Sequence, residues 1–256
     1  MKEYRKDVLT IKDIAYMMDP SILKLDTSYE DLDDLIAACK KYDFGCAFAW
    51  PGYYEEMSHR LREETKTAFG TSLGFPSGQE ATKTKVQQAE FFMTMDPAEV
   101  DMVMNVGWLI SKRYKQVEDD ISAVRKATIG SSLKVIIEAM LLNDDQITEA
   151  CKIVMSAGAD YVKTGTGFSS APTTAHHVEH IRKTVGPDYK VKVAGGVRSL
   201  DTLLRMYKLG ADRFGIGLPS ALKIIEEAKR LPNGQISMLE IDLSSDEHDV
   251  PANGGY

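Results

Sequence analysis

The sequence predicts an α/β protein with the fold of a (β/α)8 barrel, preceded by a short helix and followed by a flexible acidic tail. Short apolar segments of strand length alternate about eight times with longer segments that have the apolar spacing of amphipathic helices. Most strand segments are continuous apolar runs, which is typical of parallel strands buried on both faces. Such a number of units in 256 residues favours a closed barrel over an open doubly wound sheet.

The predicted elements can be placed in chain order, beginning with a short helix at 10–18 and a first strand at 21–26. The helix at 27–42 opens with Thr27 or Ser28 followed by acidic residues, a common helix-start signal. The later strands are predicted at 45–50, 67–76, 99–105, 133–140, 161–168, 191–198 and 213–217, and the helices between and after them at 53–65, 79–94, 108–128, 144–158, 173–186, 199–210 and 220–230. No G-x-G-x-x-G motif follows the first strand, which argues against a dinucleotide-binding sheet.

The composition changes after Arg230, where we expect a single barrel domain of residues 1–230 to end. Residues 231–256 contain five acidic residues and no Lys or Arg, and they end at Tyr256 after two glycines. A segment of this composition is expected to be a mobile tail and not a ninth unit of the barrel.

The overall composition excludes several classes of function. The net charge of −7 and the isoelectric point near 5.3 argue against broad binding to nucleic acids or anionic membranes. The apolar runs are far shorter than the roughly 18 residues that a membrane span needs, and the charged N-terminus has no signal-peptide core. We therefore expect a cytoplasmic protein. Cys39, Cys46 and Cys151 are odd in number and form no CxxC pair, which predicts buried free thiols.

Two lysines occur where apolar strands run into glycine-rich turns. Lys163 lies within YVKTGTGF (161–168), and Lys192 lies within VKVAGGVR (191–198). Asp101 lies in another apolar run, EVDMVMN (99–105). Burying a charged side chain is expensive, so each of the three is expected to have a partner or a task.

The chemistry of a lysine pair favours catalysis through an amine. A free lysine has a pKa of about 10.4 and is a poor nucleophile at neutral pH. Burial and a second nearby cation lower this pKa, and the neutral amine can then attack a carbonyl group to form an imine. A carboxylate such as Asp101 can move protons during the reaction. The alternative is that both lysines extend to solvent or pair with acids as ordinary strand residues.

Two glycine-rich turns are candidates for binding an anion. In AGGV (194–197), followed by Arg198, the glycines allow close approach of the backbone to a phosphate, and GIG (215–217) follows one unit later. Barrels of this class often bind phosphate after the seventh and eighth strands. Glycines at these positions can also simply end a strand.

Three histidines form the pattern HHxxH on the helix predicted at 173–186. A metal site would require His176 and His180 on one face together with further ligands, and an outer helix of a barrel more often presents such residues to solvent. We therefore expect neither a metal nor an organic cofactor.

Five segments, in this order and spacing, resemble the deoxyribose-phosphate aldolase family, whose members are class I aldolases with a TIM-barrel fold. They are EVDMVMN, LKVIIEAMLL, GADYVKTGTGF, KVAGGVR and GADRFG, and the resemblance covers roughly residues 11–230. It implies metal-independent cleavage of 2-deoxy-D-ribose 5-phosphate to acetaldehyde and D-glyceraldehyde 3-phosphate. The implied partners are small aldehydes and sugar phosphates, without nucleic acid or membrane, and the protein is a possible homodimer.

The resemblance also implies a role for individual residues. Lys163 matches the Schiff-base lysine, Lys192 the lysine that lowers its pKa, and Asp101 the proton-relay aspartate. Tyr256 matches a C-terminal tyrosine that helps to protonate the enamine. The supporting and substrate-binding positions are Lys134, Asp19, Lys24, Thr164, Gly167, Gly195, Gly196, Arg198 and Gly217.

The sequence departs from the family pattern on the substrate side. Gly165 stands where the family commonly has serine, Gly217-Leu218 replaces a pair of serines, and Trp50 would narrow or reshape the acceptor pocket. These changes leave two alternatives open. One is a related aldolase that acts on a different or unphosphorylated aldehyde acceptor, and the other is a non-catalytic barrel that binds a sugar phosphate.

Overall fold

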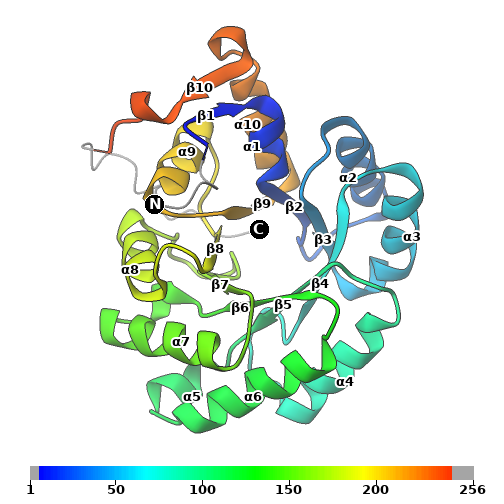
Figure 1. Ribbon diagram of the computed structural model, residues 1–256. Coiled ribbons are helices and arrows are strands. Elements are labelled where there is room, and N and C mark those ends of the chain that lie inside the picture. The colour runs from blue at the N-terminus through cyan, green and yellow to red at the C-terminus, as the bar shows by residue number, and fades with distance from the viewer. Residues whose placement is uncertain (1–5, 244–256) are drawn as a thin grey trace.

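Eight parallel strands close into a barrel in the computed structural model of the protein, which describes residues 6–243 (Figure 1). Each strand pairs with the next along the chain, and the last pairs with the first. The predicted (β/α)8 barrel is therefore confirmed. The barrel strands are β2 (Met18–Ile22), β3 (Cys46–Ala49), β4 (Ala68–Leu73), β5 (Glu99–Val103), β6 (Ser132–Ile136), β7 (Tyr161–Lys163), β8 (Lys190–Ala194) and β9 (Arg213–Gly217).

Helices surround the ring of strands (Figure 1). Several begin with a side chain that accepts a hydrogen bond from the helix's own first turn, as Ser28, Asn143 and Thr174 do for α2, α7 and α8. The helices are α1 (Ile11–Tyr16), α2 (Tyr29–Tyr42), α3 (Tyr54–Glu64), α4 (Thr82–Met93), α5 (Val106–Ile110), α6 (Tyr114–Ala127), α7 (Asp144–Ser156), α8 (Ala175–Val185), α9 (Leu200–Leu209) and α10 (Leu218–Ala228).

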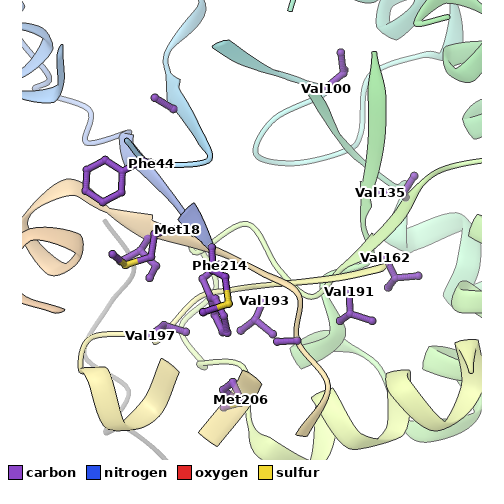
Figure 2. Packing of buried hydrophobic residues seen from close by; sticks show 14 of the residues in the cluster. Met18, Phe44, Val100, Val135, Val162, Val191, Val193, Val197, Met206 and Phe214 are labelled. Carbon is purple, nitrogen blue, oxygen red and sulfur yellow. The ribbon is translucent and has the colours of Figure 1, made fainter. Parts of the chain in front are cut away.

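The hydrophobic core lies between the strands and the helices, while charged residues of the same strands face the inside of the barrel. Val162 and Val191 are fully buried in the core, and they directly precede Lys163 and Lys192. Figure 2 shows these valines, with Val193, on the side of the strands where helices pack. Because neighbouring strand residues point to opposite faces, outward valines place the two lysines inside the barrel.

The first part of the predicted C-terminal tail has regular structure. β10 (Gln235–Ser237) pairs antiparallel with β1 (Val8–Thr10), and the short 3-10 helices η3 (Pro232–Gly234) and η4 (Met238–Glu240) flank it. Regular structure therefore extends past residue 230, where the sequence predicts the start of a tail, because pairing with β1 supplies backbone partners that the local sequence does not reveal.

Several predicted boundaries also differ from the structure, and three of these differences have an identifiable cause. The first barrel strand begins at Met18 and includes Asp19 and Pro20, which resemble turn residues in the sequence. The long helix predicted at 108–128 is two helices, α5 and α6, separated by a turn in which Lys112 has a positive φ of 58°. The strand predicted at 133–140 ends at Ile136, and the chain then turns through Glu138 at a φ of 52° into η2 (Ala139–Leu141).

A buried ion pair joins α4 to α6 outside the barrel. Lys85 Nζ lies 2.7 Å from Asp120 Oδ2 and donates to the carbonyl oxygen of Val103 at 3.0 Å, and both charged side chains are almost completely inaccessible. Thr82 donates to the other carboxylate oxygen at 2.7 Å. This pair is separate from the ionic network inside the barrel that is described below.

Among the helices of residues 6–243, none combines the length and the apolar character needed to cross a membrane.

Candidate active site

Charged side chains from six strands meet inside the barrel. The strand register places Asp101 beside Lys134, and Lys163 beside Lys192, which in turn lies beside Arg213. With the exception of Glu99, which is partly exposed, the members are buried. The network contains three carboxylates and four cations, namely Asp19, Glu99, Asp101, Lys134, Lys163, Lys192 and Arg213.

Asp101 is the centre of this network. Its Oδ2 atom lies 2.8 Å from Lys163 Nζ and 2.8 Å from Lys192 Nζ, and its Oδ1 atom lies 3.5 Å from Lys134 Nζ. The structure therefore brings Lys163, Lys192 and Asp101 together, with the supporting residue Lys134 beside them. Lys192 reaches across the barrel because Gly215 leaves room for it: a Cβ atom at that position would lie 3.3 Å from Lys192 Cε.

Two members of the network were not identified from the sequence. Glu99 pairs with Lys134, and Arg213 pairs with Asp19 and lies 3.6 Å from Glu99 Oε1. Glu99 is two residues before Asp101 on the same strand, so the alternation of strand faces could have placed it inside the barrel. Arg213 is the first residue of β9, and its contact with β2 exists only because the barrel closes.

The amine of Lys163 is tuned towards its neutral form. Burial lowers its pKa to about 8, since the desolvation of the ammonium group and the positive charge of Lys192 outweigh the attraction of Asp101. With this pKa, about a tenth of the amine is neutral at pH 7, against about one part in three thousand at the ordinary value of 10.5. A buried lysine with a substantial neutral fraction is a nucleophile.

The pKa values of Lys192 and Asp101 are instead shifted so that both side chains stay charged. Burial disfavours the charge of Lys192, but Asp101 and Asp19 outweigh it and hold the pKa of Lys192 above its usual range. Likewise, burial disfavours the Asp101 carboxylate, but Lys163 and Lys192 outweigh it and hold the pKa of Asp101 well below its usual range. Lys192 thus stays a cation and Asp101 an anion at pH values where Lys163 titrates.

A cavity of about 830 Å³ opens between the barrel mouth and the facing sides of α2 and α10. Gly167, Gly195 and Gly196 line it with positive φ angles of 86°, 92° and 96°, which favour glycine. Most of the substrate-binding residues expected from the sequence also line this cavity: Lys24, Gly167, Gly195, Gly196, Arg198 and Gly217.

Two serines also line the cavity and were not assigned to it from the sequence. Ser220 lies in the first turn of α10, three residues after Gly217, and Ser21 lies on β2. Ser220 therefore places a serine on the cavity wall three residues after Gly217. The sequence pattern Gly-Leu-Pro-Ser could have identified this serine as a candidate for the site, because the serine falls within the first turn of a helix.

Three expected site residues are placed differently or lie outside the description. Asp19 belongs to the buried ionic network, where its Oδ2 atom lies 2.8 Å from Lys192 Nζ. The hydroxyl of Thr164 lies 2.8 Å from that of Thr173 and donates to the carbonyl oxygen of Ala194, so it joins β7 to β8. Tyr256 lies outside the described residues.

Gly165, where the family commonly has serine, lies close to the ends of two side chains. A Cβ atom here would lie 2.7 Å from Met140 Cε and 3.0 Å from Glu138 Oε1. The Glu138 carboxylate accepts a hydrogen bond from the Thr166 backbone, and burial raises its pKa. Glu138 itself lies beyond the end of β6, directly before η2.

Trp50 packs with two other aromatic rings that follow barrel strands. Its ring centroid lies 5.8 Å from that of Phe75 and 5.9 Å from that of Phe168, and Phe75 and Phe168 are 5.4 Å apart. The indole N–H donates to the carbonyl oxygen of Lys24 at 2.9 Å, which fixes the ring beside one wall of the cavity.

A buried lysine with a lowered pKa, a permanently charged second lysine and a shared carboxylate inside a (β/α)8 barrel are the arrangement expected of an aldolase that works through an imine. Residues 12–227 match the family described as DeoC/LacD family aldolase. The chain belongs to this family.

Similar proteins share most of the chain's length. A deoxyribose-phosphate aldolase of Lysinibacillus sphaericus is 40% identical over 205 residues, which are 80% of this chain and 92% of the relative. A deoxyribose-phosphate aldolase 1 of Staphylococcus aureus is 38% identical over 198 residues, 77% and 90% of the two chains. Among solved structures, the deoxyribose phosphate aldolase from Aeropyrum pernix, described as a tetramer, matches with a TM-score of 0.80 at 28% identity and covers 87% of this chain and 94% of its own.

Proposed function

We propose that this protein is a class I aldolase that reversibly cleaves 2-deoxy-D-ribose 5-phosphate to acetaldehyde and D-glyceraldehyde 3-phosphate. The single observation that carries the proposal is the contact of Lys163, with its pKa of about 8, with an Asp101 carboxylate that also holds the charged Lys192. The substrate is inferred from the relatives, which are named deoxyribose-phosphate aldolases.

In the cleavage direction, the neutral Lys163 amine attacks C1 of the open-chain sugar, and loss of water gives a protonated imine. The hydroxyl on C3 loses its proton and becomes a carbonyl group, while the C2–C3 bond breaks and its electron pair moves towards the iminium nitrogen. This releases glyceraldehyde 3-phosphate and leaves an enamine. A proton is added at C2, and hydrolysis returns the Lys163 amine and releases acetaldehyde.

The network supports the charges that form along this path. Asp101, already 2.8 Å from Lys163 Nζ, stabilises the positive iminium nitrogen. The charge of Lys192 keeps Lys163 partly neutral before the reaction. Lys134 contacts the second oxygen of Asp101, and Asp19 forms an ion pair with Lys192. Because the pKa of Asp101 is held low, a proton passes through its carboxylate only briefly on the way to or from substrate or water.

The cavity supplies the features expected of a phosphate site. Lys24 and Arg198 line it with positive charge, and the backbone at Gly195 and Gly196 is open enough for a phosphate oxygen to approach. Gly217 and Ser220 belong to the start of α10, where backbone N–H groups favour an anion.

The decisive experiment is reductive trapping of the imine. Incubation with acetaldehyde and borohydride should add one ethyl group per chain, and peptide mapping should find it on Lys163. A Lys163→Met variant should not be labelled. Lys190→Met removes an exposed lysine two residues before Lys192 and should be labelled like the wild type. Label on another lysine, or equal label in Lys163→Met, would refute the mechanism.

The pKa of Lys163 predicts the pH dependence of the reaction. The neutral amine is the reactive form, so kcat/KM for cleavage should fall about tenfold per pH unit below pH 8 and level off above it. The measurement is a pH profile of kcat/KM with deoxyribose 5-phosphate at constant ionic strength. An inflection near the ordinary lysine value of 10.5 would show that the barrel does not tune this amine.

Replacing Arg198 with leucine should weaken recognition of the phosphate alone. A lost charge-assisted hydrogen bond is worth about 1.5–3 kcal/mol, so KM for deoxyribose 5-phosphate should rise about 10- to 100-fold. The KM for unphosphorylated deoxyribose should stay unchanged, because that substrate has no phosphate to bind. An equal rise for both substrates would assign Arg198 a structural role.

The aromatic cluster of Trp50, Phe75 and Phe168 favours a second candidate, an aldolase for a different or unphosphorylated acceptor. These rings and Leu218 add apolar surface near the cavity. Comparison of kcat/KM for free and phosphorylated deoxyribose separates the two candidates. A strong preference for the phosphate ester would remove the second.

Tyr256 remains a proposed proton donor to the enamine. If it has this role, deletion of Tyr256 should slow proton exchange at the donor carbon more than it slows imine trapping. Equal losses in both measurements would instead indicate a structural role. The cytoplasmic location and the homodimer also stay predictions, and light scattering on the purified protein tests the latter.

A further inference from the structure

The histidines of the HHxxH pattern meet an aspartate from the neighbouring helix. α7 and α8 lie side by side on the outside of the barrel (Figure 1). Asp144 is the first residue of α7, and His176 and His180 are one turn apart on α8. His176 Nε2 lies 2.8 Å from Asp144 Oδ1, and His180 Nδ1 lies 3.8 Å from Asp144 Oδ2.

The hydrogen-bond partners of His180 indicate which of its two ring nitrogens carries the proton. Its Nε2 atom lies 3.0 Å from the carbonyl oxygen of Asp144, which can only accept a hydrogen bond, and 2.9 Å from the Thr148 hydroxyl. We therefore assign the proton of the neutral ring to Nε2. The lone pair of Nδ1 then faces a carboxylate oxygen 3.8 Å away, an arrangement that a cation bound between them would stabilise.

The three side chains have the chemistry and spacing of transition-metal ligands. One ligand atom from each lies within 4.8 Å of the others. Two atoms bound tetrahedrally to Zn²⁺ at about 2.0–2.1 Å are about 3.3 Å apart. The two oxygens of the Asp144 carboxylate lie 2.8 Å and 3.8 Å from the facing nitrogens of His176 and His180, on either side of that value. The contact of His180 Nε2 with a backbone carbonyl oxygen is the support that metal-bound histidines commonly have.

We propose that Asp144, His176 and His180 form a binding site for a divalent transition metal, with Zn²⁺ as the best match, that ties the start of α7 to α8. Three protein ligands leave a fourth position for water. Imidazole nitrogens with one carboxylate select this class of metal over Mg²⁺ or Ca²⁺, which prefer oxygen ligands alone.

The proposed metal site lies on helices that follow two connections at the barrel mouth, but it is separate from the reacting residues. α7 follows the connection that carries Glu138 and Met140, and α8 follows the connection that carries Thr166 and Gly167. A metal bound here would hold these two connections together. The proposal is therefore independent of the imine chemistry, and no step of the proposed reaction passes through the metal.

The chain offers a matched control in His177, the neighbour of His176. Its Nδ1 atom accepts a hydrogen bond from the Thr174 backbone at 3.2 Å, as part of the cap of α8. His177→Ala therefore removes an imidazole from the same helix without removing a proposed ligand.

The test is a titration of the full-length, tag-free, chelator-stripped protein with ZnCl₂, followed by calorimetry. We expect one equivalent of Zn²⁺ per chain in the wild type and in His177→Ala. We expect affinity at least tenfold lower in His176→Ala, His180→Ala and Asp144→Asn. Excess Zn²⁺ should raise the melting temperature by at least about 2 °C in the wild type and in His177→Ala, and not in the three ligand variants. Titration with Co²⁺ should give the visible absorption of a tetrahedral site.

The same measurements can overturn the proposal. Absence of binding in the wild type would show that the three side chains form only a hydrogen-bonded cluster. Unchanged affinity in the three ligand variants would assign the metal to other residues, such as His59 or the segment after residue 243. Melting curves without metal show whether each variant is folded, which is expected because His176 and Asp144 are largely exposed.

Discussion

Replacing Lys163 with methionine should abolish cleavage and leave the protein at least as stable as the wild type. Loss of the nucleophile should lower kcat by about four to six orders of magnitude. Stability should behave differently, because the ionic network has four cations for three carboxylates. Removing Lys163 leaves three of each, and Asp101 keeps Lys192 at 2.8 Å and Lys134 at 3.5 Å. Removing one partner of a buried pair costs about 3–5 kcal/mol when it leaves an uncompensated charge. Asp101 keeps two cations here, so we expect no such loss of stability.

Lys85→Met is the matched control for the stability part of this prediction. Lys85 is also fully buried, but its partner Asp120 would then remain buried without its cation, at a cost of about 3–5 kcal/mol. The measurements are steady-state turnover and urea unfolding at pH 7. Wild-type turnover in Lys163→Met would contradict the imine mechanism. Destabilisation equal to that of Lys85→Met would contradict the proposed excess of positive charge. Turnover that depends on Lys163 would also dismiss a non-catalytic barrel.

The fold was accessible from the sequence because the barrel strands carry its strongest local signals. Val191, Val193 and their equivalents form apolar runs with glycines after them, and each run needs helices on its outer face. The predicted boundaries of helices and strands were wrong where tertiary contacts override the local preference of the sequence. Asp19 and Pro20 belong to a strand because Asp19 is held by Lys192 and Arg213, which are remote in sequence. The turn at Lys112 leaves no Gly or Pro signal.

The candidate site was only partly accessible for the same reason. Lys163, Lys192 and Asp101 stand out because charge inside an apolar run is unusual. Glu99 and Arg213 begin their strands, where charged residues usually face solvent, and only barrel closure turns them into partners of Lys134 and Asp19. The helix carrying HHxxH could be identified, but its third candidate ligand comes from a different helix.

Asp101→Asn should produce the largest loss of stability among the changes to the network. Asparagine keeps the shape but removes the carboxylate, so Lys163, Lys192 and Lys134 lose the negative charge they share. Removing one partner from a buried pair costs about 3–5 kcal/mol, and the excess of positive charge becomes larger. We expect the urea midpoint at pH 7 to fall accordingly, and cleavage to be lost with it, because the carboxylate that stabilises the iminium nitrogen is gone.

The double variant Asp101→Asn with Lys163→Met tests the origin of this loss. It has three cations for two carboxylates and so restores the charge balance of the wild type. If excess charge is the cause, the second substitution should recover about 1–3 kcal/mol of the free energy of unfolding while activity stays absent. Lys152→Met, on the exposed side of α7, should recover nothing in the same background. Additive effects of Asp101→Asn and Lys163→Met would show that the two side chains stabilise the barrel independently, against the shared network seen inside it.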